Sequence, residues 1–124
     1  MNKKIFRAED GIDEDTCLSM YDNDPDFYIM ILDAFCKDCI RTSNGMKETY
    51  DADDKENYAV LVHGLKGAGG SAGAGYLVEI ATRSNDLMKA DRFDQAYEMH
   101  EDILNELDRL ITLIPERISG FKEN

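Results

Sequence analysis

Hydrophobic residues recur along this chain every three or four positions, the spacing that places side chains on one face of an α-helix. The longest such pattern covers residues 25–50 and comprises Phe27, Ile31, Phe35, Cys39 and Met46. Similar patterns over 54–70, over 74–89 and from Phe93 onward predict three further helices, and the segment 13–20 predicts a short helix before them. The alternating pattern of a half-buried strand is nearly absent.

Local signals mark where these helices begin and end. Asp24 suits an N-cap and Pro25 the first helical position. Residues 51–54 form the next cap region, and the glycine cluster that follows His63 predicts a turn near residues 71–74. Pro115 is expected to end or kink the last helix. Four amphipathic helices joined by short loops predict an all-α fold, an antiparallel four-helix bundle with a short extra N-terminal helix.

Length and charge narrow the function. The 124 residues fit a single domain over 1–124, with the bundle at about 11–114. A net charge of −12 argues against nucleic acid or a membrane surface as the partner. No apolar run approaches the roughly 18 residues that span a bilayer, and the N-terminus lacks the apolar core of a secretory signal. Three cysteines fit the reducing cytoplasm. The initial methionine favours a free-standing protein. One bundle buries the hydrophobic faces of all four helices, which predicts a monomer.

His63 is the candidate for chemistry, because helical phase turns it away from the core. The stripe predicted to face the core lies on the opposite side of its helix and comprises Tyr58, Leu61, Leu65, Ala68 and Ala72. The residues that share the side of His63 are Ala59, Val60, Lys66, Gly67 and Gly70. Small side chains let a macromolecule approach the imidazole, and Lys66 can neutralise an anion there. A neutral imidazole with no carboxylate neighbour suits nucleophilic attack on a phosphoryl group.

The stretch "HGLKGAGGSAGAGYL" resembles the signature of the histidine-containing phosphotransfer (HPt) domain family. The matching positions are His63, Leu65, Lys66, Gly67, Gly73 and Leu77. The resemblance covers residues 11–110 or so and implies a four-helix bundle that works in a two-component phosphorelay. It implies that His63 accepts a phosphoryl group from a receiver-domain phospho-aspartate and passes it to another receiver. Lys66 would then lie near the phosphate, and Gly67 would make room for the partner, a response-regulator receiver or a hybrid histidine kinase.

The family often has a glutamate or glutamine on the next helix, hydrogen-bonded to the other ring nitrogen, and Asn85 stands there in this chain. Ser84 and Asn85 replace the usual Leu-Glu pair. A hairpin pivot near Ala72 would put Ala81 level with His63 and Asn85 a turn further along, so the ring-orienting role of Asn85 stays open. Lys89 matches a position that is basic in some members, and it either faces the phosphate or is ordinary surface.

The chain lacks the parts of a self-sufficient phosphoryl-transfer enzyme. No metal-binding acidic cluster and no phosphate-binding loop motif occur, so we expect a carrier without a metal or cofactor of its own, whose receiver partner brings magnesium. Cys36 and Cys39 form a lone C-x-x-C pair, with Cys39 expected in the core and Cys36 at its edge. His100 is expected to be a packed or edge histidine. The alternative function is an HPt-like interaction module that binds a receiver or another partner without carrying phosphate, and its sequence support is the Ser84–Asn85 departure.

Overall fold

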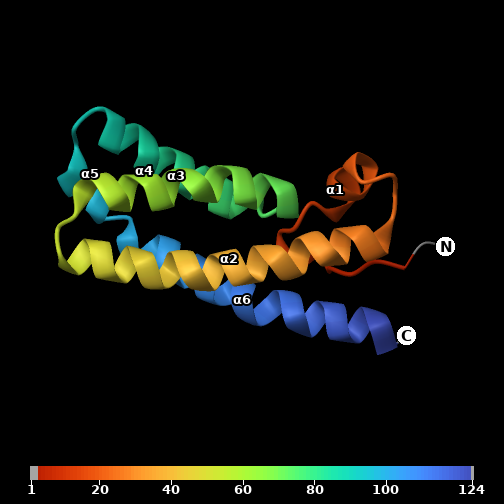
Figure 1. Cartoon of the computed structure of the whole chain (residues 1–124). Helices are drawn as coiled ribbons and strands as arrows, with labels where there is room; N and C mark the ends of the chain where they lie inside the picture. The colour runs from red at the N-terminus through yellow and green to blue at the C-terminus, as the bar shows by residue number, and fades with distance from the viewer. Residues whose placement is uncertain (1–2, 124) are drawn as a thin grey trace.

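The computed structural model describes residues 3–123, and these residues form helices joined by short connections (Figure 1). In chain order the elements are η1 (Ala8–Asp10), α1 (Glu14–Met20), α2 (Pro25–Asp51), α3 (Lys55–Ala72), α4 (Gly75–Lys89), α5 (Phe93–Tyr97) and α6 (His100–Glu123). Within residues 3–123 there is no strand, although Ile12 and Ala74 form an isolated antiparallel bridge. The predicted all-α class is confirmed. The prediction of one domain over 1–124 stays a prediction, and residues 1–2 and 124 lie outside the described part.

The four long helices pack side by side as a bundle. α2 contacts α3, α3 contacts α4, α4 contacts α6 and α6 contacts α2, so each helix has two neighbours. Figure 1 shows the chain reversing direction between α2 and α3 and again between α3 and α4, with α6 running back along α2. The short helix α1 lies at one end of the bundle, against α2 and α3, as predicted.

A capping side chain at one end and a left-handed glycine turn at the other set the limits of the helix that carries His63. The Asp54 side chain accepts a hydrogen bond from the backbone N–H of Asn57 and so caps the start of α3. The other end of α3 is closed by Gly73, whose φ of 84° lies in the left-handed region. A Cβ atom at Gly73 would lie 2.8 Å from the carbonyl oxygen of Asp13. The turn therefore consists of Gly73 and Ala74, shorter than the predicted 71–74.

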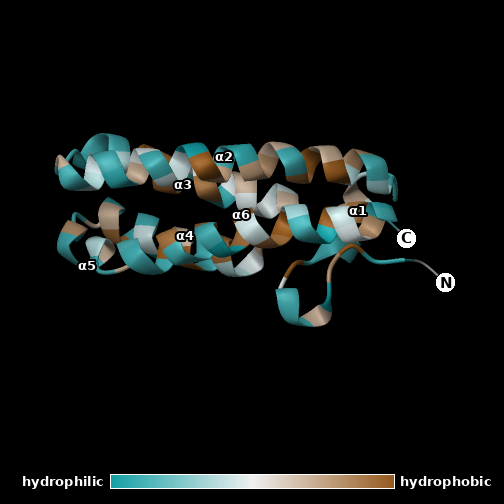
Figure 2. Cartoon of the chain, turned by 90° about the horizontal axis from the view of Figure 1, so that it is seen from below, coloured by the Kyte–Doolittle hydropathy of each residue, from teal (hydrophilic) through white to brown (hydrophobic). Residues whose placement is uncertain are grey.

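The core lies between the four long helices, and hydrophobic and hydrophilic segments succeed one another along each of them (Figure 2). Its largest fully buried side chains are Tyr28, Tyr58, Leu32, Met46, Leu65, Leu77, Ile103, Leu107, Leu110, Ile114, Val62 and Cys17. On α3, Leu61 and Ala68 are only half-buried, whereas Val62 and Gly69 are buried. The buried stripe of α3 is thus rotated by about 40° from the prediction. The rotation brings Gly69 against α4, where a Cβ atom would lie 2.9 Å from Val78 Cγ2.

The prediction of one continuous last helix from Phe93 is wrong, because the chain breaks between α5 and α6. The break lets two rings from either side of it pack on the same tyrosine. Tyr97 meets Tyr50 edge-on at 5.0 Å, and the His100 ring stacks on Tyr50 at 3.9 Å. His100 Nδ1 also forms a 2.9 Å hydrogen bond with the hydroxyl of Tyr58. Tertiary packing of aromatic rings therefore overrides the local helical pattern.

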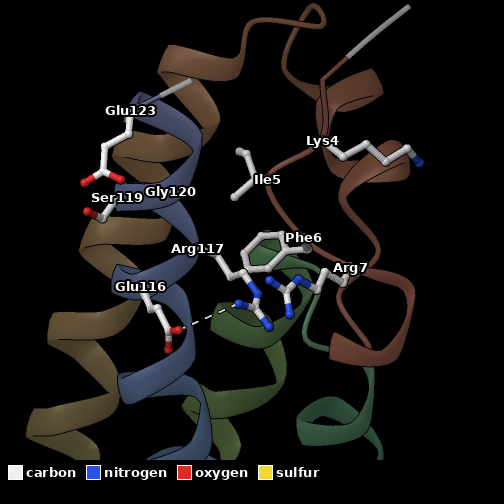
Figure 3. Close-up of a pocket in the computed structure, with 9 residues that line it drawn as sticks. All are labelled: Lys4, Ile5, Phe6, Arg7, Glu116, Arg117, Ser119, Gly120 and Glu123. Carbon is white, nitrogen blue, oxygen red and sulfur yellow. Dashed lines mark ion pairs between the residues drawn. The ribbon is translucent and has the colours of Figure 1, made fainter.

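Pro115 does not end the last helix, since α6 continues to Glu123. The residues beyond the proline are held by tertiary contacts: Ile118 is buried, and Arg117 forms a 2.8 Å ion pair with the buried Asp10. Figure 3 shows the segment 4–7 beside this end of α6, with a cavity of about 520 Å³ between them. This cavity lies at the C-terminal end of α6 and contains none of the residues around His63.

Candidate functional site

His63 lies in the middle of α3 with an exposed side chain. The helix surface around it is clear of bulk. Gly64, Gly67 and Gly70 are exposed, and a Cβ atom at any of them would have no other heavy atom within 4 Å. Val60, one turn before His63, is 65% exposed. A second macromolecule can therefore approach the imidazole across small side chains of α3, with Lys66 as the long side chain beside it.

One ring nitrogen of His63, Nδ1, is hydrogen-bonded to a side chain of α4. The His63 Nδ1 atom lies 3.3 Å from the Oδ1 atom of Asn85, in a hydrogen bond between two side chains. Asn85 is only 4% exposed, so its amide is fixed by its surroundings. The turn at Gly73–Ala74 explains the contact. Equal numbers of residues counted from the centre of this turn, backward along α3 and forward along α4, bring Ser84, not Ala81, level with His63. The expected pivot near Ala72 is wrong by one to two residues.

The Asn85 hydrogen bond favours the tautomer of His63 that carries the proton on Nδ1. An amide oxygen can only accept, so Nδ1 must donate its N–H to Asn85 Oδ1. A neutral imidazole has one N–H, which leaves Nε2 with a free electron pair. Within residues 3–123, Nε2 has no hydrogen-bond partner. The arrangement can present Nε2 as a nucleophile on an open face.

The remaining predicted site residues take different positions around this ring. Lys66 is half-buried at the i+3 position, and Ala59 is half-buried at i−4. Lys89 is the last residue of α4, exposed, and four positions beyond Asn85 on the same side of that helix. Neither lysine has an ion pair within the described part of the chain. Both ammonium groups remain available to an incoming anion.

Other candidate chemistry lies in the core. Burial raises the pKa of the Cys36 thiol to about 11 and that of the Cys39 thiol to about 12, so both are unreactive thiols at neutral pH. His100 is 5% exposed, and burial lowers its pKa. Among residues 3–123, no three His, Cys, Asp or Glu side chains are placed to hold a metal ion. In the same residues, no helix has both the length and the apolar character to cross a membrane.

Sequence reasoning missed the side chains that hold the C-terminal end of α3. The hydroxyl of Tyr21 donates to the carbonyl of Ser71 at 2.8 Å, and that of Tyr28 donates to the carbonyl of Ala72 at 2.6 Å. The available signal was negative: the end of α3 is rich in glycine and offers no side chain that could satisfy its last carbonyls. Donors had to come from another segment.

Comparison with protein families matches the chain to the family described as Hpt domain over residues 30–113. The match covers most of the chain and all the residues around His63. Comparison with curated proteins gives no match, and comparison with solved structures gives none either. The matched range includes α3 and α4, the helices that carry His63 and Asn85.

Proposed function

The chain belongs to the Hpt domain family, whose members work in phosphotransfer in two-component phosphorelays, and from that premise we propose that it is a histidine phosphotransfer protein. It accepts a phosphoryl group on His63 from the phospho-aspartate of one receiver domain and passes it to the aspartate of another. The observation that carries the proposal is the pairing of His63 with Asn85, which leaves Nε2 free on an exposed face. A histidine with no chemistry needs neither the fixed tautomer nor the cleared surface.

The transfer is a displacement at phosphorus. The Nε2 electron pair forms the N–P bond while the P–O bond to the receiver aspartate breaks, and the aspartate leaves as a carboxylate with that electron pair. The Nδ1 proton stays on the ring and remains hydrogen-bonded to Asn85 Oδ1. In the second step the N–P bond breaks, the electron pair returns to Nε2, and the carboxylate of the next receiver forms the new P–O bond. No proton has to leave the protein in either step.

The surroundings of His63 support the roles we assign to them. The Lys66 ammonium neutralises charge on the phosphoryl group, and Ala59, Val60, Gly67, Gly70 and Lys89 contribute to the docking surface. The receiver supplies magnesium and the in-line geometry, so the chain acts as a phosphoryl carrier rather than as a self-sufficient catalyst. We place it in the cytoplasm as a monomer, with receiver domains or a hybrid histidine kinase as its partners.

The test is phosphoryl transfer from a phosphorylated receiver in the presence of magnesium. We expect the wild-type protein to gain an acid-labile, base-stable label, and His63→Gln to gain none. His100→Gln is the matched control, because the chain has only two histidines. A label that survives His63→Gln and disappears in His100→Gln would show that His100, and not His63, accepts the phosphoryl group. No label on the wild-type protein with a range of receivers would favour the alternative, a module that binds a partner without carrying phosphate.

A further inference from the structure

The half of α3 that follows His63 is a weak helix by composition. Glycine is the least favourable residue in a helix interior apart from proline, and Gly64, Gly67, Gly69 and Gly70 occupy one short stretch. Of these, Gly69 is required by packing, since a Cβ atom there would lie 2.9 Å from Val78 Cγ2. The exposed glycines gain nothing from burial, so this part of the helix needs stabilisation from outside.

That stabilisation comes from α1 with its two cap residues and from the start of α2, which provide partners for the last carbonyl groups of α3 and for that of Gly73. Tyr21 donates to the Ser71 carbonyl and Tyr28 to the Ala72 carbonyl. The Cys17 thiol lies 3.6 Å from the same Ser71 carbonyl oxygen, and the Asp13 N–H donates to the Gly73 carbonyl at 3.0 Å. We name these four residues, Asp13, Cys17, Tyr21 and Tyr28, the carbonyl clamp. Helix C-termini usually satisfy such carbonyls with water or with their own chain, so four partners from another segment are a specific device.

The clamped turn of α3 also lines a shallow groove of about 190 Å³ on the part of α3 that follows His63. Ala68 and Ser71 form one wall of this groove, and Ile31, Ala34, Phe35 and Asp38 of α2 form the other. Gly67 and Gly70 lie on the same exposed part of α3. The position of this wall depends on the last turn of α3, and that turn depends on the clamp.

We propose that the carbonyl clamp positions the C-terminal half of α3 for docking of the receiver domain, and this proposal rests on the function proposed above. Tyr21 and Tyr28 are positioning residues: their hydroxyls touch neither His63 nor any group on it, and they act through the backbone of α3. His63 is held separately by Asn85, two turns towards the start of α3. Loss of the clamp should therefore weaken docking and leave the chemical step at His63 unchanged.

The test uses Tyr21→Phe and Tyr28→Phe, which remove only the hydroxyl and keep the aromatic packing. Tyr76→Phe is the matched control, because Tyr76 is 51% exposed on α4 and its hydroxyl has no hydrogen bond within the described residues. Amide hydrogen exchange of residues 70–74, followed by NMR, should become about 3- to 10-fold faster in each clamp variant. Exchange in α6 should not change, and Tyr76→Phe should match the wild type.

The second measurement separates docking from chemistry. With a phosphorylated receiver in excess, each clamp variant should need about 3-fold more receiver for half-maximal transfer, while the transfer rate at saturation stays that of the wild type. Unchanged exchange at 70–74, or equally faster exchange in α6, would overturn the clamp. Faster local exchange with unchanged receiver affinity would overturn its role in docking. The exchange measurement needs neither phosphate nor a partner, so it stays decisive if the protein proves not to carry phosphate.

Discussion

Replacing Asn85 by leucine tests the hydrogen bond on which the proposed mechanism depends. Leucine has the same number and branching of side-chain heavy atoms as asparagine and suits a buried position, so the change removes the acceptor oxygen without opening a cavity. The Nδ1–Oδ1 distance of 3.3 Å is long for an N–H···O bond, and water can replace the amide at an exposed ring. The bond is therefore worth about 0.5–1 kcal/mol, the lower half of the usual range. We expect the rate of phosphoryl transfer at saturating receiver to fall about 2- to 5-fold.

Two measurements check this expectation. The nitrogen chemical shifts of His63 should show less of the Nδ1–H tautomer in Asn85→Leu than in the wild type, and single-turnover transfer should slow in parallel. Asn105→Leu makes the same chemical change at an exposed position of α6 and should alter neither quantity. An unchanged tautomer in Asn85→Leu, or a transfer rate that falls without any change of tautomer, would refute the assignment of Asn85 as the ring-orienting residue.

Two further predictions concern charge. Lys66→Ala should leave the thermal unfolding midpoint nearly unchanged and slow transfer about 3- to 10-fold, because one ammonium near a phosphoryl group contributes about 1 kcal/mol. Lys47, an exposed lysine of α2, gives the control, and a transfer rate in Lys66→Ala equal to that in Lys47→Ala would make Lys66 an ordinary surface residue. Burial lowers the pKa of His100 in the folded protein, so as the pH falls the imidazole is protonated in the unfolded chain before it is protonated in the folded one. The neutral His100 therefore contributes to stability above about pH 6.5, and this contribution is lost as the pH falls below that value. The unfolding midpoint should therefore fall between pH 7.5 and pH 5.5, and this fall should be smaller in His100→Gln; an equal fall in both proteins would contradict the assignment.

Local signals predicted the helices and the exposed face of His63, whereas contacts between helices decided what could not be predicted. The start of α2 at Pro25 follows from its own cap, and the exposure of His63 follows from helical phase. The level of Asn85 depends on where α3 turns into α4, and a shift of one or two residues in that turn moves the facing position by about three residues. The break before His100 depends on ring stacking with Tyr50, a residue fifty positions earlier.

The small residues around His63 do more than clear space, because they also keep negative charge away. The chain has 26 acidic residues among 124, yet α3 contains only Glu56, in its first turn. A carboxylate about 6 Å from an incoming phosphoryl group would oppose each of its negative charges by about 0.7 kcal/mol even in water. A glutamate at the position of Asn85 would hold the ring in the same tautomer but would add such a charge. In the mechanism we propose, the neutral amide of Asn85 therefore combines with the acid-poor surface of α3 to present the nucleophile to a dianion in a protein whose overall charge would otherwise repel it.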